Sequence, residues 1–599
     1  MVVRSNRAVQ HASEPVLCTL LQALNTDETR ARHVKCDEGH PSCQRCRTGG
    51  RDCAYGVPGS AQKRPRGELR MVHYVVKVPK DPSSFPNWTS PAKRSLDFYR
   101  YRTCIELAGG TISELWSTFV LQAAHCHPAV RHAVIALGAL HEAFWRSTTV
   151  HSTNFAVQEY SKAIRDVSSL RLNESNETLH IALLCCMLFA AFESLRGYYK
   201  SALTHISSGM KLVAAHEIDN EYVKRTSYSW GLIQPVFVCL DTQAMEVCDD
   251  LLPSTGVPLE KLNPLLLPET FTSIEEASKS FTIYRNHILH FFQRYERLLD
   301  PEIIAKEAQD VRAEQVKLAR YFHDWCDVFN RAHFETHHPQ VLIIQMYITV
   351  VKMIATLIPS PHETKWDGSM AYFNGVVELG EEFMRQQGIS LRTYPNHGGL
   401  QNNWIQEGGC NSDIPRRTNE SSSRSTSTAP SSRSSESTFW DSELSSQEAS
   451  IQQTFTVAHG VVTPLYMVCT RCRDPMIRRR ALRILQTCNR KEGIWDSAQS
   501  ALVAERIIQI EEAAADGFVT DASHIPSQAR IQQIETSFGP GKPGKIMYTM
   551  NGATSPITIV EHLSDGNGQA NWEAREEAMK SRSFFSTRFA VLPRQTLLS

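Results

Sequence analysis

The chain has no net charge and no long hydrophobic run. Its 63 lysines and arginines balance 63 aspartates and glutamates over 599 residues, which argues against a uniformly basic protein that coats nucleic acid. The longest uninterrupted apolar run, Ile181 to Phe192, is twelve residues long, whereas a membrane-spanning helix needs ~20. The sequence therefore predicts a large globular chain without a membrane partner.

Signatures of the common enzyme families are also missing. The sequence contains no GxSxG, Walker loop, GxGxxG or protein-kinase pattern. His125, His127, His132 and His141 lie close together, but their neighbours are apolar residues typical of a core. We interpret these histidines as structural and predict that the chain is not an enzyme. A helical enzyme, the weaker alternative, would need a pocket of converging polar groups with perturbed pKa values.

A disulfide framework is not indicated either. Sixteen cysteines are few for this length, and most are scattered through apolar segments, as is typical of a reducing compartment. Cys469 and Cys472 form an isolated CxxC, which we expect to pack in the core on a helix.

Between residues 30 and 56, by contrast, cysteines and basic residues are concentrated. Four cysteines are separated by six, two and six residues. Thiolates at such short, fixed spacings can converge on a tetrahedral zinc ion, which folds a segment too small for a core of its own. Nine basic and three acidic residues give Arg30–Arg66 a local net charge of +6, typical of a nucleic-acid contact surface. The predicted zinc ligands are Cys36, Cys43, Cys46 and Cys53.

This segment resembles the C-terminal two-thirds of the fungal binuclear zinc cluster, in which six cysteines hold two zinc ions. The resemblance is carried by Lys35-Cys36-Asp37-Glu38, Pro41, Cys43-Gln-Arg-Cys46 and Cys53-Ala-Tyr55. It implies that Cys43 bridges two metals, that Cys46 and Cys53 bind one zinc, and that Cys36 binds the other.

The first cysteine pair of that pattern is absent, because Thr26 and Thr29 occupy its positions. As written, the chain offers four thiolates, enough for at most one zinc. His33 or His40 as an additional ligand is the weaker alternative. Since the resemblance begins abruptly at Arg30, we expect residues 1–29 to come from a misassigned exon or start.

The resemblance also assigns residues that face DNA. Arg32, His33 and Lys35 match positions from which the first short helix of the family reaches base edges of CGG-type triplets, where arginine and lysine can donate to guanine. Residues better placed to contact phosphates are Arg30, Arg45, Arg47 and Arg51. A candidate nuclear localisation signal, Lys63, Arg64 and Arg66, lies in a basic, proline-containing linker over residues 57–94.

Helical periodicity dominates residues 95–515. Pro128 is placed to open a helix. Apolar residues at helical spacing predict helices over 155–170, 179–192, 198–215, 274–299, 308–331 and 341–357. No alternation of strands and helices indicates a parallel sheet.

The helical region is similar to the fungal-specific transcription factor domain. The similarity is carried by Phe98-Tyr-Arg-Tyr-Arg102, by Pro128 to Glu142, by Phe192-Glu193 with Gly197, His205 and Gly209, by Leu240-Asp241-Thr-Gln243, by Arg471-Cys-Arg-Asp-Pro475 and by Gly493-Ile-Trp495. It implies an all-helical regulatory body that couples DNA binding to partners or small-molecule signals.

Two segments interrupt or follow this body. Thirteen of the eighteen residues from Ser421 to Thr438 are serine or threonine. Such a tract buries too little apolar surface to fold, so we predict a disordered insertion over 411–450. Residues 516–599 form a polar tail in which Gly539-Pro-Gly-Lys-Pro-Gly544 favours a small hairpin.

We therefore predict an all-α protein with a small zinc-stapled DNA-binding module, a flexible linker and a large all-helical regulatory domain. Its expected function is nuclear, zinc-dependent and sequence-specific binding of double-stranded DNA at RNA polymerase II genes, for example those of a biosynthetic gene cluster. The alternative is a helical interaction protein with a degenerate zinc finger that does not bind DNA. The sequence leaves open a homodimer and the identity of any effector.

Overall fold

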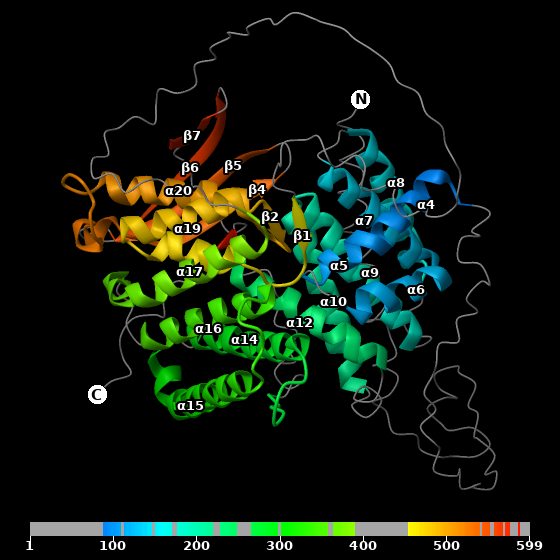
Figure 1. Cartoon of the computed structure of the whole chain (residues 1–599), viewed down its shortest axis with the longest axis horizontal. Coiled ribbons are helices and arrows are strands. Elements are labelled where there is room, and N and C mark those ends of the chain that lie inside the picture. The colour runs from blue at the N-terminus through cyan, green and yellow to red at the C-terminus, as the bar shows by residue number, and fades with distance from the viewer. Residues whose placement is uncertain are drawn as a thin grey trace, which may run out of the picture.

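The fold is known from a computed structural model of the chain (Figure 1). It describes residues 88–109, 113–146, 150–170, 176–219, 228–247, 265–297, 301–357, 363–389, 453–539, 542–551, 556–566, 569–574 and 585–586. Within these ranges the chain is mostly helical with two small sheets, which confirms the predicted fold class.

The N-terminal part of the body is a bundle packed around α7 (Pro128–Trp145) and α9 (Asn176–Leu195). Its other helices are α4 (Ser90–Phe98), α5 (Cys104–Leu107), α6 (Val120–Cys126), α8 (Val150–Ser168) and α10 (Tyr199–Asp219), with π-helical turns η1 (Tyr99–Thr103) and η2 (Leu115–Phe119). The body begins slightly before residue 95, because the Thr89 hydroxyl accepts a hydrogen bond from Ala92 N and caps α4.

Helix α7 is buried along most of its length, and it begins where the sequence predicts. Pro128 stands in its first turn, where the missing N–H costs nothing. Gly138 faces α4 so closely that an added Cβ would lie 2.2 Å from the carbonyl oxygen of Ser95. The two helices can meet at this distance only because position 138 has no side chain.

Helix α9 is the central helix of the bundle. Its window Thr178–Leu195 is long and apolar enough to cross a membrane by length and composition, and 89% of it is buried inside the fold. The six predicted helices all exist, with ends within a few residues except at the N-terminal ends of α8, which starts at Val150, and α15, which starts at Pro301.

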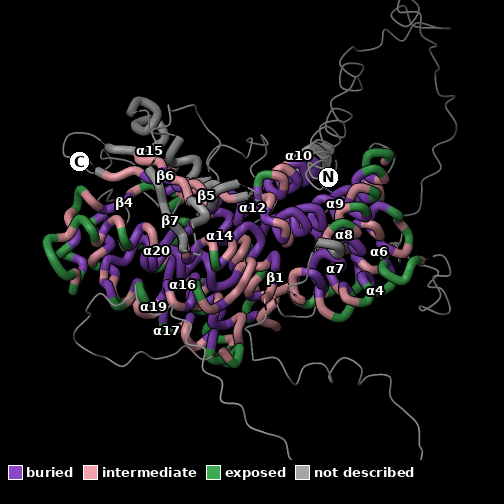
Figure 2. Tube along the Cα trace, turned by 90° about the horizontal axis from the view of Figure 1, so that it is seen from above, coloured by how far each residue is buried: buried purple, intermediate pink, exposed green. Residues whose placement is uncertain are grey.

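The middle of the chain adds a second layer of helices, shown in green in Figure 1. They are α12 (Tyr228–Val247), α14 (Ile274–Arg297), α15 (Pro301–Arg331), α16 (Pro339–Leu357), the 3-10 helix η3 (Glu363–Ser369) and α17 (Met370–Gln386). A separate core forms between α14, α15 and α16 around Trp325, which packs against Phe281 and Phe329 with ring centroids 4.7 and 5.1 Å away. Most other buried residues belong to one continuous core, visible as purple segments along the inner helices in Figure 2.

A small three-stranded sheet joins the middle of the chain to the next helices. β1 (Thr454–Thr456) pairs in parallel with β2 (Arg490–Glu492), which pairs antiparallel with β3 (Trp495–Asp496). The helices α18 (Val462–Arg471) and α20 (Ser497–Ala513) pack against it, and α19 (Pro475–Thr487) packs on those two helices. The parallel pair of β1 and β2, which the sequence pattern did not indicate, is only three residues long.

The C-terminal region contains more structure than the small hairpin that the sequence predicts. β4 (Ile531–Gly539) and β5 (Lys542–Asn551) form that hairpin, and β6 (Pro556–Gly566), β7 (Gln569–Ala574) and β8 (Phe585–Ser586) extend it to an antiparallel sheet of order β7-β6-β5-β4-β8. Ile531, Ile534, Ile546 and Tyr548 are buried in the main core. The sheet therefore packs on the helical body through one apolar face.

Candidate functional site

All fourteen residues that the sequence assigns to zinc, DNA or nuclear import precede residue 88, outside the described residues. They are Cys36, Cys43, Cys46 and Cys53; Arg30, Arg32, His33, Lys35, Arg45, Arg47 and Arg51; and Lys63, Arg64 and Arg66. The predicted insertion over 411–450 also lies outside the described ranges. These assignments stay predictions.

The donor chemistry of the cysteine segment can still be judged. Four thiolates are the preferred ligand set of a tetrahedral structural zinc. Two zinc ions held by a six-cysteine cluster would need two more thiolates, and Thr26 and Thr29 cannot provide them. The residues present therefore fit one zinc and fall short of two.

The body positions that resemble the regulatory domain form interlocking structural contacts. The ring of Phe192 on α9 stacks on Tyr160 of α8 with centroids 4.3 Å apart. The Tyr160 hydroxyl and His205 Nε2 on α10 are hydrogen-bonded at 2.9 Å. Gly209, one turn later on α10, allows the ring of Phe237 on α12 to lie against the helix. A Cβ atom added at position 209 would lie 2.2 Å from that ring. These motif residues thus fix how α8, α9, α10 and α12 pack.

His205 is held as a neutral imidazole by its surroundings. The side chain is almost completely buried, and burial lowers its pKa to about 3 because a charged ring would lose its hydration. A neutral ring at physiological pH suits a structural hydrogen bond and does not suit a proton-transfer role.

A second group of motif residues links α12 to the three-stranded sheet. Gln243 Nε2 donates to the carbonyl oxygen of Val457 at 2.9 Å, and Gly493 N donates to that of Thr456 at 2.7 Å. Gly493 has φ +61°, and an added Cβ would lie 1.8 Å from Gln243 Oε1. A glycine is required here by both backbone conformation and space.

The Arg471–Pro475 motif is the centre of a buried ionic cluster. Glu363 Oε1 and Oε2 accept hydrogen bonds from Arg471 and Arg473 at 2.8 and 2.9 Å. Glu511 accepts from Arg473 and Arg478 at 2.8 and 2.9 Å. All five side chains are at most 4% exposed, so this cluster joins η3, α18, α19 and α20 inside the core.

The ionic cluster also attaches the C-terminal sheet. Glu511 accepts a third hydrogen bond, from Ile531 N at 3.0 Å, and Arg471 donates to the carbonyl oxygens of Ile531 and Gln532 at 3.1 and 2.9 Å. Although burial acts to raise it, the charges of Arg473 and Arg478 lower the pKa of Glu511. Glu511 therefore stays ionised and fixes the first residue of β4.

The clustered histidines have partners that indicate structural roles. His141 is fully buried, with Nδ1 2.9 Å from Thr103 Oγ1 and Nε2 3.1 Å from Glu106 Oε2. His132 Nδ1 lies 2.6 Å from Glu159 Oε2. Among the described residues, no group of three or more His, Cys, Asp or Glu side chains is arranged to hold a metal ion.

The CxxC pair packs in the core, as the sequence predicts. Cys469 lies in α18 and Cys472 caps its C-terminal end, and both are fully buried. Burial raises the pKa of Cys472 to about 12 and that of Cys469 further. Both thiols therefore stay protonated and unreactive near neutral pH.

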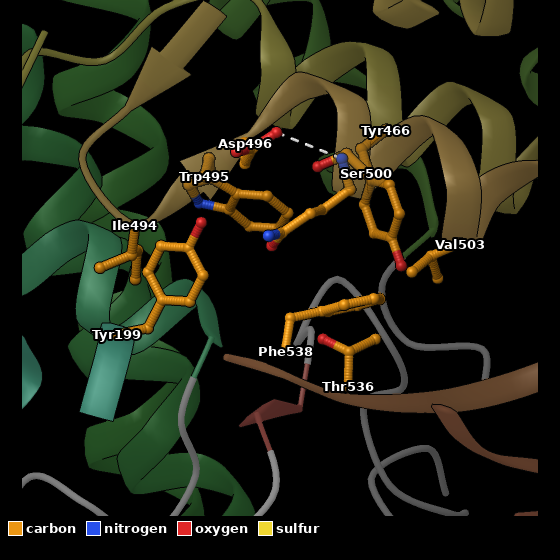
Figure 3. A pocket seen from close by; sticks show the side chains of 10 residues that line it. Tyr199, Tyr466, Ile494, Trp495, Asp496, Ser500, Val503, Thr536 and Phe538 are labelled. Carbon is orange, nitrogen blue, oxygen red and sulfur yellow. Dashed lines mark hydrogen bonds between the residues drawn. The ribbon is translucent and has the colours of Figure 1, made fainter. Parts of the chain in front are cut away.

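One cleft in the described part of the chain was not anticipated from the sequence. It lies where α10, α18 and α20 meet β3 and β4, and Figure 3 shows the rings of Tyr199, Tyr466, Trp495 and Phe538 around it. Its other lining residues are Ile494, Asp496, Gln499, Ser500, Val503 and Thr536. Only the Gly493-Ile-Trp495 motif gave a signal in the sequence. The residues that follow it in the lining carry no motif, and Tyr199, Tyr466, Thr536 and Phe538 come from distant segments.

Comparison with known families identifies two domains. Residues 27–61 match the fungal Zn(2)-Cys(6) binuclear cluster domain. Residues 94–231 match the fungal specific transcription factor domain. This match runs from the middle of α4 to the first turn of α12. The first match contains all four clustered cysteines, and the second contains the interlocked helices of the N-terminal bundle.

Three curated fungal proteins are similar to the chain. The aspercryptin biosynthesis cluster-specific transcription regulator of Emericella nidulans is 26% identical over 590 residues, which cover 87% of this chain and 92% of that protein. A transcription regulator of Purpureocillium lilacinum is 28% identical over 217 residues, 31% of this chain and 47% of that protein. A Zn(2)-C6 fungal-type transcription factor of Aspergillus fumigatus is 32% identical over 115 residues, 19% of this chain and 30% of that protein.

No solved structure matches the chain significantly. The two domain matches confirm both resemblances that the sequence indicated, in the order in which they were expected. The chain therefore contains a match to each of the two domain models, and the curated proteins similar to it are fungal transcription regulators.

Proposed function

We propose that this chain is a nuclear regulator that binds double-stranded DNA at CGG-type sites of RNA polymerase II genes and depends on zinc to do so. The observation that carries the proposal is the coincidence, in one short segment, of the zinc-cluster match over 27–61 with four cysteines at metal-ligand spacing. The local net charge of +6 supports it, because phosphate neutralisation provides most of the affinity for DNA.

Each residue of the segment has a proposed role. Zinc, when bound by Cys36, Cys43, Cys46 and Cys53, would supply a tetrahedral cross-link that folds the segment. Lys35 and Arg32 donate to base edges, with His33 beside them, and Arg30, Arg45, Arg47 and Arg51 contact phosphates. Lys63, Arg64 and Arg66 direct the chain to the nucleus.

We infer a pathway-specific role from the relative that is similar over most of its length. That protein is named as specific for one biosynthesis cluster, and the similarity covers 92% of it. The two matched domains and the similar proteins are those of transcription regulators. They favour a regulatory function for this chain over a catalytic one. The target genes proposed for this chain are accordingly those of one biosynthetic gene cluster.

The zinc content tests the ligand assignment. The chain as written should retain at most one zinc per molecule, and the double variant Thr26→Cys, Thr29→Cys should retain two, because six thiolates are then present. Atomic absorption on protein freed of weakly bound metal measures the number of zinc ions per chain. The control is the double variant Thr19→Cys, Thr26→Cys, which adds the same number of thiols at an unsuitable spacing. Two tightly held zinc ions in the unmodified chain would show that the ligands have been misassigned.

DNA titrations of the Thr26→Cys, Thr29→Cys protein test the proposed roles. Lys35→Ala should cost about 1–3 kcal/mol on a CGG-type duplex and reduce the preference for it, because a base-edge donor is lost. Arg51→Ala should weaken binding to CGG-type and scrambled duplexes alike and reduce the salt dependence by about one ion, because a phosphate contact is lost.

The same titrations separate the proposal from its alternative. An interaction protein that does not bind DNA would show no preference for the CGG-type duplex at any salt concentration, even with both threonines replaced. An equal loss on both duplexes for Lys35→Ala would place this lysine on the backbone and would contradict the base-reading role.

A further inference from the structure

The aromatic cleft exists only in the assembled fold. Tyr199 comes from α10, Tyr466 from α18, Trp495 from β3, Gln499 from α20 and Phe538 from β4. The cleft leaves about 60 Å³ free for the centre of a water-sized molecule, several times the ~10–15 Å³ that one water molecule needs. The enclosed part therefore suits one ring of a ligand, and a second ring would extend into the open mouth.

The walls of the cleft are held in place by the core. Tyr199, Tyr466 and Trp495 are each less than 9% exposed, and the rings of Tyr466 and Trp495 lie 5.5 Å apart. Phe538 lies against Gly544 on β5, where an added Cβ would come within 2.5 Å of its ring. A ligand would therefore meet aromatic surfaces that need little reorganisation.

The cleft offers no charge to a ligand. Asp496 is its one charged lining residue, and its carboxylate has partners within the protein. The Oδ1 atom caps α20 by accepting hydrogen bonds from Ala498 N and Gln499 N at 3.0 and 3.2 Å. Its other oxygen pairs with Lys491 at 3.1 Å. Burial raises the pKa of Tyr199, so that its hydroxyl stays neutral. The remaining polar groups are the Tyr466 hydroxyl, the Trp495 indole N–H and the side chains of Gln499, Ser500 and Thr536.

We propose that this cleft binds an uncharged small molecule of one or two flat rings with a hydrogen-bonding substituent. Flat rings gain from stacking and edge contacts with the aromatic walls, and a neutral donor or acceptor finds the amide and hydroxyl groups of the lining. A charged ligand would lose hydration without meeting an opposite charge. The proposal goes beyond the DNA-binding function, since it involves neither zinc nor DNA.

The cleft lies where a bound ligand would contact both the helical body and the C-terminal sheet. Its lining belongs both to the helical body and to β4, the strand that attaches the C-terminal sheet. A ligand bound to the folded chain and not to the unfolded one stabilises the fold, and in this cleft it does so across the contact between body and sheet.

Two fluorescent probes with the same aromatic skeleton test the chemistry on the full chain. 2-Naphthol, which has two fused rings and a hydroxyl group, is uncharged, and 6-hydroxynaphthalene-2-sulfonate carries one added sulfonate. We expect saturable binding of one uncharged probe per chain, with at least tenfold weaker binding of the sulfonate, and a rise in the thermal unfolding midpoint with the uncharged probe alone.

Matched variants test the location. Gln499→Trp fills the cleft from α20, whereas Ala498→Trp places the same side chain at an exposed neighbouring position. Thr536→Trp fills it from β4, and Gln533→Trp is the exposed control on that strand. Each filling variant should weaken binding of the uncharged probe at least tenfold, and each control should keep it within twofold.

Two results would overturn the proposal: filling variants that bind the uncharged probe like their controls, or equal affinities for the two probes. Circular dichroism identifies a filling variant that does not fold. In that case the other filling variant, which enters the cleft from the opposite wall, provides the test of location. Because no DNA or zinc enters the measurement, a negative result would leave the proposed DNA-binding function unaffected.

Discussion

Glu511→Gln should lower the free energy of unfolding by about 3–5 kcal/mol, because it leaves two buried guanidinium groups without their shared counter-charge. Arg473 and Arg478 both donate to the Glu511 carboxylate, and none of the three side chains is exposed to solvent. Glutamine keeps the size of the side chain but removes the charge and places an N–H₂ group toward one arginine. The effect therefore reports the loss of the charge and of one hydrogen-bond acceptor at nearly constant side-chain size.

A matched substitution controls for the general cost of losing a carboxylate. Glu381 binds Arg480 through both of its oxygens, but each side chain of that pair is 30% exposed. Glu381→Gln should cost no more than about 1 kcal/mol, because solvent screens the pair. Urea unfolding followed by circular dichroism gives both values, and equal losses for Glu381→Gln and Glu511→Gln would contradict the buried-cluster assignment.

Gly138→Ala should cost about 2–3 kcal/mol, although alanine is the better helix former, because overpacking forces two helices apart. The atom that the new methyl group would meet is the carbonyl oxygen of Ser95, 2.2 Å away. A backbone atom cannot turn aside as a flexible side chain can. Helix α4 would have to shift relative to α7.

Gly375 provides the comparison, since it also lies inside a helix, α17. An added Cβ there would have its nearest neighbour, Thr349 Cγ2, at an ordinary contact distance of 3.8 Å. Gly375→Ala should therefore be neutral or stabilising by up to ~1 kcal/mol. Thermal unfolding of both variants distinguishes the sites, and a neutral Gly138→Ala would mean that α4 does not pack tightly on α7.

Local features of the sequence were sufficient to predict seven of the longer helices, namely α7, α8, α9, α10, α14, α15 and α16. The periodic apolar residues of α9, α14 and α16 define helices whose ends agree with the structure to within about three residues. Helix α12 was missed, because Pro235 stands inside it and a proline normally ends a helix. The long apolar part of α12 packs against α10 and α14, and this burial outweighs the lost backbone hydrogen bond.

The predicted zinc ligands and phosphate contacts of residues 30–66 likewise required no knowledge of the fold, because their prediction depends on residue type and short separation along the chain. The second sheet was predicted only in part from the sequence. Its central hairpin has a turn signal at Gly539–Gly544, whereas β6, β7 and β8 depend on pairing with it.

The sequence by itself determined the positions of seven of the longer helices and predicts where a metal could bind, because both depend on residues close together along the chain. Only the tertiary structure decided that Glu363 and Glu511 neutralise arginines up to 110 residues away, and that Tyr199 and Phe538 face one cleft. Such contacts join distant segments, and no local pattern specifies them. Charge balance in a core and the shape of a cleft are properties of the packed chain, and they arise only when its helices and strands exclude water together.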